Sequence, residues 1–205
     1  MEARAAKQLA LYEQMRSSGS VDLAASLGNE LVAKYPGTAA AVEAQKTLAD
    51  VRAKAVQKGE SQRLARLWAY NAVPEAGGTQ YTAAIESTPP LKPGADRKNR
   101  RIRLVLREHP KWGQSVYLLL DNATFDCRKG CATLPVSFDD AKPERMKATI
   151  PPTGEPALFI DDDKGFIARL AKTRTVSIGV TLKDEGDMQV VFEVSGLDSS
   201  QLHVK

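Results

Sequence analysis

Both cysteines of this 205-residue chain lie in one short loop between two runs of apolar residues. The segment 116–136 reads VYLLLDNATFDCRKGCATLPV, and three residues separate Cys127 from Cys131. The apolar runs at 116–120 and 132–136 are typical of β-strands. We expect these two strands to be adjacent and antiparallel, with the cysteine loop between them.

The cysteine pair could form a disulfide, supply half of a metal site or remain as two free thiols. A structural zinc site needs about four ligands, and the only histidines, His109 and His203, lack metal-ligand spacing to the pair. The spacing is also one residue longer than a Cys-x-x-Cys redox motif. A disulfide would remove about 2 kcal/mol of chain entropy in loop-closure theory, and Gly130 suits a tight turn. We therefore favour a disulfide and an oxidising compartment.

Composition predicts a globular chain, since 42% of residues are hydrophobic and 26% are charged. No apolar run approaches the roughly 20 residues needed to cross a bilayer. The first residues, MEARAAK, form a charged helical start rather than a secretory signal. Either the protein is cytoplasmic, or the sequence begins after a removed signal or anchor. The formal net charge of +4 is modest and is compatible with an anionic partner.

Residues 1–60 predict a helical domain, because they are rich in the helix formers Ala, Leu, Glu, Gln and Lys. Polar or turn-forming segments at 17–20 and 35–37 divide them into about three helices, with Ser20 and Thr38 as candidate N-caps. Gly59 marks either a hinge or a continuation of the third helix. The expected buried faces repeat at spacings of three and four: Leu9, Tyr12 and Met15; Leu23, Leu27 and Leu31; and Ala41, Ala44, Leu48, Val51 and Ala55.

The segment ELVAKYPGTAAAVEAQKTLADV at 30–51 resembles a tetratricopeptide-type helical hairpin. Its first helix ends at Tyr-Pro and its second is rich in small residues. Such hairpins usually come in arrays, because one hairpin cannot bury both of its faces, and we find no clear second copy. We interpret the segment as a hairpin that packs on the next domain or on a partner. A peptide-binding groove and a dimerising hairpin are the alternatives.

Residues 61–205 predict a second domain made of short strands. Helical periodicity is replaced there by apolar segments that turns separate. We expect one short helix at 164–171, with Phe166, Ile167 and Leu170 on its buried side. The predicted fold class is therefore α+β: an N-terminal helical hairpin of about three helices, then an antiparallel β-sandwich with one short helix. The expected strands are 67–70, 81–85, 101–107, 116–120, 132–136, 145–150, 157–160, 175–182 and 188–194.

The β part resembles the invasion-associated locus B-like group of Gram-negative cell-envelope proteins and some secretion-associated lipoproteins. The resemblance covers residues 66–198. It implies an exported protein, periplasmic or lipid-anchored, whose natural N-terminus precedes residue 1, and it implies no particular activity. The matching features are Trp68-x-Tyr70, Ala84-x-x-Ser87, IRLVLR at 102–107, VYLLL at 116–120, Phe125-Asp-Cys127, VSFDD at 136–140, LFIDDDKGFIARL at 158–170 and FEVSGL at 192–197.

The densest basic segment of the chain is a candidate binding site for an anion or a partner. Strand alternation at 101–107 places arginines on one face and apolar residues on the other. Guanidinium groups fit carboxylates and phosphates, so this face could bind an acidic protein patch, an anionic polymer or a lipid headgroup. A solvated face that resists edge aggregation is the alternative. The candidate residues are Arg97, Lys98, Arg100, Arg101, Arg103 and Arg107.

No pattern in the sequence predicts catalysis, a metal or a cofactor. The chain has no GxSxG, HExxH or glycine-rich phosphate loop. The acidic run at 161–163 could begin a calcium loop, but Lys172 occupies the position of the bidentate glutamate. We interpret that run as a helix cap instead. Nucleic acid is disfavoured, because no helix-turn-helix or zinc finger is present.

These patterns lead to one main hypothesis and two alternatives. We expect a non-enzymatic cell-envelope interaction or adaptor protein that binds another envelope or secreted protein in the periplasm. Any membrane attachment would come through an N-terminal anchor that this sequence lacks. The first alternative is an inhibitor or immunity protein that blocks a toxin or hydrolase. The second is a polyanion-binding domain that uses the arginine-rich strand face.

Overall fold

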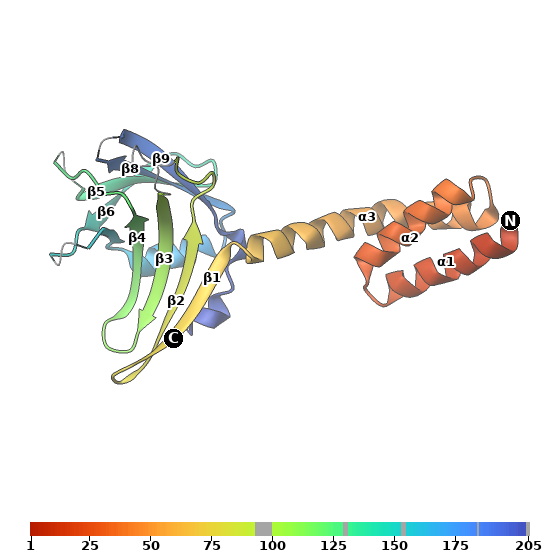
Figure 1. Ribbon diagram of the computed structural model, residues 1–205, viewed down its shortest axis with the longest axis horizontal. Helices are drawn as coiled ribbons and strands as arrows, with labels where there is room; N and C mark the ends of the chain where they lie inside the picture. Colours follow the sequence, from red (N-terminus) through yellow and green to blue (C-terminus); the bar gives the residue numbers. More distant parts are fainter. Residues whose placement is uncertain (93–99, 129–130, 153–154, 184, 204–205) are drawn as a thin grey trace. The chain divides into compact units, whose positions relative to one another are not determined.

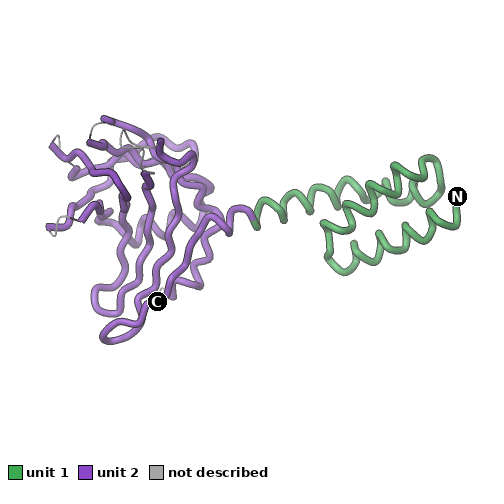
Figure 2. The backbone as a smooth tube through the Cα atoms, viewed as in Figure 1, with its two compact units in different colours: residues 1–62 green, residues 63–205 purple. Residues whose placement is uncertain are grey.

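The computed structural model describes residues 1–92, 100–128, 131–152, 155–183 and 185–203. It has the expected α+β class, with N-terminal helices followed by strands and one short helix (Figure 1). The chain divides into two compact units, Met1–Gln62 and Arg63–Lys205 (Figure 2). The third helix, α3 (Ala39–Ala65), is continuous through Gly59, so the chain has a helix there rather than a hinge.

The helical unit contains α1 (Glu2–Ser17), α2 (Val21–Lys34) and α3 as far as Gln62. Thr38 caps α3, because its hydroxyl oxygen accepts the amide N–H of Ala41 at 3.2 Å. Ser20 occupies the N-cap position of α2, but its side chain makes no capping hydrogen bond. The shared core consists of Ala5, Tyr12, Ala24, Leu31, Ala40, Ala44, Leu48 and Val51.

The buried face of α2 differs from the predicted leucine stripe. Leu31 is buried and Leu27 packs against the core, as predicted, but Leu23 is 59% exposed, and Ala24 and Gly28 are buried in addition. A Cβ atom at Gly28 would lie 2.6 Å from Leu48 Cδ1 and 2.9 Å from Tyr12 Cε2. The three helices meet too closely for a larger side chain at that point, so packing selects the small residues over the leucine repeat.

In the described part of the β unit, nine strands form one hydrogen-bonded sheet, in the order β1-β2-β3-β4-β7-β6-β5-β8-β9. All neighbouring strands are antiparallel, and they group into three meanders, β1 to β4, β5 to β7 and β8 to β9. The elements are β1 (Trp68–Glu75), β2 (Gly78–Glu86), β3 (Arg101–His109), β4 (Gly113–Asp121), β5 (Thr133–Phe138), β6 (Glu144–Thr149), β7 (Ala157–Ile160), α4 (Asp163–Leu170), β8 (Thr175–Leu182) and β9 (Gly186–Glu193).

The sheet curves so that both of its ends enclose one core (Figure 1). This core combines Leu104 and Leu118 of the first meander with Ile178 and Phe192 of the last. The amide of Thr88, which follows β2, donates to the carbonyl of Val191 in β9 at 2.7 Å. The two opposed layers expected for a sandwich are therefore parts of one continuous sheet.

The expected pairing of the two strands beside the cysteine loop is wrong. β4 pairs with β3 and β7, whereas β5 pairs with β6 and β8. The connection between β4 and β5 is much longer than a two- to five-residue hairpin loop. It pairs with β8 instead: Phe125 forms a bridge with Leu182, and the Asp126 amide donates to the Thr181 carbonyl at 2.8 Å.

The acidic run before α4 acts as a helix cap. The Asp162 carboxylate accepts the amide N–H of Gly165 at 3.1 Å, in the N-cap geometry that the sequence predicts. Within the described ranges, no three His, Cys, Asp or Glu residues gather in a way that could hold a metal ion. None of the described helices is long and apolar enough to cross a membrane.

Asp139 provides a test of stability against pH. Its carboxylate accepts the amides of Thr175 at 2.9 Å and Arg174 at 2.8 Å. These bonds, with Thr175 contributing most, lower the pKa of Asp139 below its usual value. The stabilisation is therefore present above the pKa of the unfolded state and is lost as pH falls through the folded pKa. We expect the free energy of unfolding to fall less between about pH 7 and about pH 3 in Asp139→Asn than in the wild type. Urea titrations at both pH values measure this difference, and an equal loss of unfolding free energy in the variant and the wild type would contradict the prediction.

Candidate functional site

The described arginines of the predicted basic site lie on or beside β3, on the face opposite the core. Ile102, Leu104 and Leu106 are fully buried, so Arg101, Arg103 and Arg107 point to the other side of the sheet. Arg100 precedes the strand. Arg97 and Lys98 lie outside the described residues.

Most of these arginines have acidic partners within the chain. Arg103 binds both carboxylate oxygens of Asp121 at 2.9 and 3.0 Å. Arg101 forms an ion pair with Glu86 at 3.2 Å, and Arg100 pairs with Glu185. Each partner comes from a neighbouring strand or turn and cancels one positive charge. The basic segment is therefore less positive than its sequence indicates.

Arg107 differs, because aromatic rings surround its guanidinium group. The guanidinium carbon lies 5.6 Å from the ring centroid of Tyr117, 5.7 Å from Trp112 and 6.0 Å from Phe159. Its Nε donates to the Ser115 hydroxyl at 3.0 Å. Among the described residues, no carboxylate lies within ion-pair distance of Arg107. We call Arg107, Trp112, Tyr117 and Phe159 the arginine–aromatic surface.

Strand register brings this surface together. Tyr117 of β4 is paired with Phe159 of β7, and their rings stack with centroids 4.8 Å apart. Burial raises the pKa of the Tyr117 hydroxyl, and the nearby Arg107 and Arg103 partly offset this effect. The hydroxyl is therefore protonated at neutral pH and available as a hydrogen-bond donor.

The turn between β3 and β4 holds Trp112 at the edge of the surface. Trp112 is 66% exposed, and its indole ring stacks on the imidazole of His109 with ring centroids 4.0 Å apart. His109 is buried, and its Nδ1 accepts the amides of Lys111 at 3.0 Å and Trp112 at 3.2 Å. Gly113 closes the turn with a φ of 70°. His109 thus positions an exposed tryptophan.

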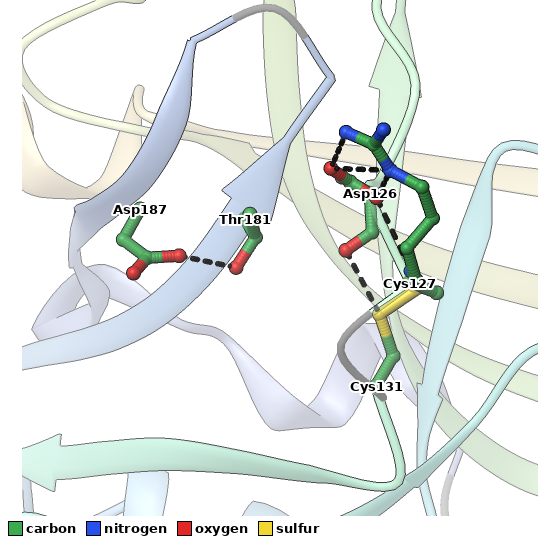
Figure 3. Close-up of a disulfide and its surroundings, with 6 residues drawn as sticks. Asp126, Cys127, Cys131, Thr181 and Asp187 are labelled. Atoms are coloured by element: carbon green, nitrogen blue, oxygen red, sulfur yellow. Dashed lines mark hydrogen bonds and ion pairs between the residues drawn. A yellow bond between two sulfur atoms is a disulfide. The ribbon is translucent and has the colours of Figure 1, made fainter.

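The cysteine loop contains the expected disulfide. Cys127 and Cys131 are bonded, with Cα atoms 5.1 Å apart (Figure 3). The Asp126 carboxylate beside it accepts hydrogen bonds from Arg128. On neighbouring strands, the Thr181 hydroxyl lies 2.6 Å from a carboxylate oxygen of Asp187. The disulfide thus fixes the loop that pairs with β8.

The aromatic members of the surface were absent from the predicted site. Alternation along 116–120 was enough to place Tyr117 outward. However, its neighbours Phe159 and Trp112 come from a later strand and from a turn, and only the strand register shows that they meet Arg107.

Comparison with known proteins shows a likeness among solved structures but not among families or curated proteins. No family of known proteins matches the chain, and no curated protein does. Among solved structures, invasion associated protein B from Bartonella henselae aligns with a TM-score of 0.41 and 14% identity, over 67% of this chain and 90% of that chain. Membership of the invasion-associated locus B-like group stays a prediction from the sequence motifs.

Proposed function

We propose that this chain is a non-enzymatic interaction protein of the cell envelope that binds another protein through its arginine–aromatic surface. The exposed Trp112 beside Arg107 and Tyr117 carries this proposal. Trp, Tyr and Arg are the residues that most often dominate the binding energy of protein interfaces. Here they share one face, and the rigid strands β4 and β7 hold two of the four side chains, so little conformational entropy would be lost on binding.

The ion pairs of the basic segment favour a protein partner over a polyanion. A polyanion site relies on several uncompensated cations, and its affinity falls steeply with salt. On this face Arg101 and Arg103 are engaged by Glu86 and Asp121. Among the described arginines of this segment, Arg107 is the one without a carboxylate partner, and aromatic rings surround it. This arrangement suits a partner that offers a carboxylate within an apolar patch.

The disulfide supports the proposed compartment. Disulfides persist mainly in oxidising compartments, and the periplasm is one of them. We propose that the protein faces the periplasm. The buried His109, whose Nδ1 accepts two backbone amides, fits a structural role in the turn and supports the non-enzymatic part of the proposal.

Capture from native envelope extract tests the proposal. Tagged wild-type protein should retain one protein at both about 0.1 M and about 1 M salt, because short-range contacts are screened little. Trp112→Ala should reduce the amount captured about tenfold, since a buried interface tryptophan contributes more than about 1.4 kcal/mol. The captured protein is quantified by mass spectrometry.

Val56→Ala is the matched control, because Val56 is an exposed apolar residue of the helical unit. It should bind as the wild type does. Equal capture by Trp112→Ala and the wild type would reject the arginine–aromatic surface. Capture that disappears at about 1 M salt would instead support the polyanion alternative.

A further inference from the structure

A cleft of about 510 Å³ opens between β5 and β8, beside the disulfide loop. Cys131 and Phe125 line one side of it, and Met188 of β9 lines another. Sites for small molecules usually enclose about 300–1,000 Å³ and combine apolar walls with a few polar groups. The cleft has a suitable size, and it does not include any residue of the arginine–aromatic surface.

The cleft exists because the ladder between β5 and β8 stops early. Their pairing ends at Val136 and Ile178, and the same register would place Pro135 opposite Gly179. Proline has no amide N–H to donate. A Cβ atom at Gly179 would lie 2.5 Å from Pro135 Cγ, so only glycine fits opposite the proline ring. Beyond this point the two strands are no longer paired, and β8 pairs with the disulfide loop through Asp126 instead.

The apolar part of the cleft lining reaches the core of the unit. Leu158 of β7, Leu134 of β5 and Val180 of β8 line it, and all three are buried. The partly buried Phe125 and Met188 contribute further apolar surface. Methionine adapts its shape to an irregular apolar ligand. These walls suit a flexible hydrocarbon chain.

The rim provides one cation for an anionic head group. Arg145 of β6 is paired with Pro135, and its guanidinium donates to the Thr133 hydroxyl at 2.7 and 3.1 Å. In the part of the chain that the structure describes, Arg145 has no ion pair with a carboxylate. The acidic rim residue Asp187 already bonds the Thr181 hydroxyl at 2.6 Å. Arg145 is thus the rim group best suited to hold a carboxylate.

We propose that this cleft binds an acyl carboxylate, a molecule with one hydrocarbon chain and one carboxylate head. The chain lies against the partly buried Phe125, Pro135 and Met188, above the buried floor of the cleft, and the carboxylate binds Arg145. This site is separate from the protein-binding surface, so each can fail without the other.

Isothermal titration with monomeric dodecanoate, below its micelle concentration, tests the site. Wild-type protein should bind it saturably, and dodecyltrimethylammonium, which has the same tail and the opposite charge, should bind more weakly. Arg145→Gln should weaken dodecanoate binding about fivefold, the size expected for an exposed ion pair. Met188→Trp should fill the mouth of the cleft and abolish saturable binding. Arg66→Gln removes an exposed arginine outside the cleft and should bind as the wild type does.

Thermal unfolding of each variant shows whether it is folded. If Met188→Trp does not fold, Arg145→Gln and the comparison of head groups decide. Absent dodecanoate binding, equal binding of the two head groups, or binding that Arg145→Gln leaves unchanged would overturn the proposal. Cosedimentation with phosphatidylglycerol vesicles identifies the source of the acyl chain. If the protein cosediments with vesicles but does not bind monomeric dodecanoate saturably, it adsorbs to the membrane surface, and the proposed cleft site is overturned.

Discussion

Phe166→Ala is expected to destabilise the β unit by about 3–5 kcal/mol, the usual cost of removing a buried phenylalanine side chain. Phe166 is fully buried on α4, and its ring packs edge-on against Phe138 with centroids 5.3 Å apart. The alanine variant would lose both the buried area and the aromatic contact and would leave a cavity in the core of the β unit. Urea unfolding followed by tryptophan fluorescence measures the change, because both tryptophans, Trp68 and Trp112, lie in this unit.

Two variants on the same helix serve as comparisons for Phe166. Phe166→Leu should cost less than the alanine change, because leucine refills part of the volume. Lys164 is exposed, and Lys164→Ala should change the free energy of unfolding by less than about 0.5 kcal/mol. A loss below about 1 kcal/mol for Phe166→Ala would show that α4 contributes little to the core.

Gly196→Ala is expected to destabilise the β unit by about 1–3 kcal/mol, the range for overpacking, or more. A Cβ atom at this position would lie 2.3 Å from both the carbonyl carbon and the carbonyl oxygen of Leu64, and 2.6 Å from the Ala65 nitrogen. These are backbone atoms at the end of α3, so no side-chain rotation can relieve the clash. The same close approach lets the Trp68 indole donate to the Val194 carbonyl at 3.3 Å.

Gly59→Ala is the matched control for Gly196, because nothing lies within 4 Å of a Cβ atom at Gly59. Alanine favours a helix over glycine by about 1 kcal/mol, so this variant should not destabilise the chain. Both variants can be followed by urea unfolding. If Gly196→Ala unfolds at the same urea concentration as the wild type, the end of α3 does not pack against Gly196 as described.

Local patterns predicted the elements of this fold well. Alternation along 101–107 identified the buried leucines of β3, and the acidic run identified the cap of α4. The failures involve contacts between distant segments. Leu23 belongs to a regular repeat, yet Gly28 determines how closely α2 approaches its neighbours. The pairing of β4 with β7 depends on a register that no local pattern contains.

The arginine–aromatic surface and its basic neighbours were likewise predictable only in their local part. The arginines followed from strand alternation, but their partners did not. Asp121 and Glu86 become neighbours of Arg103 and Arg101 only after β2, β3 and β4 are paired. The cleft had a local signal in Pro135, since a proline within a strand interrupts its ladder. Its position opposite Gly179 required the pairing of β5 with β8.

The three meanders have a consequence for how the β unit folds. Each can form from segments that are neighbours in the chain, but the sheet is completed only by two pairings between meanders, β4 with β7 and β5 with β8. Such non-local pairings require the closure of a chain loop first, which slows folding. The disulfide lies in the connection from β4 to β5 and shortens the chain that must close before β7 reaches β4. Because that disulfide closes a loop of only five residues, Cys127 to Cys131, oxidation of the cysteines should change the rate of sheet assembly little, and the rate should depend on the long connections between meanders instead.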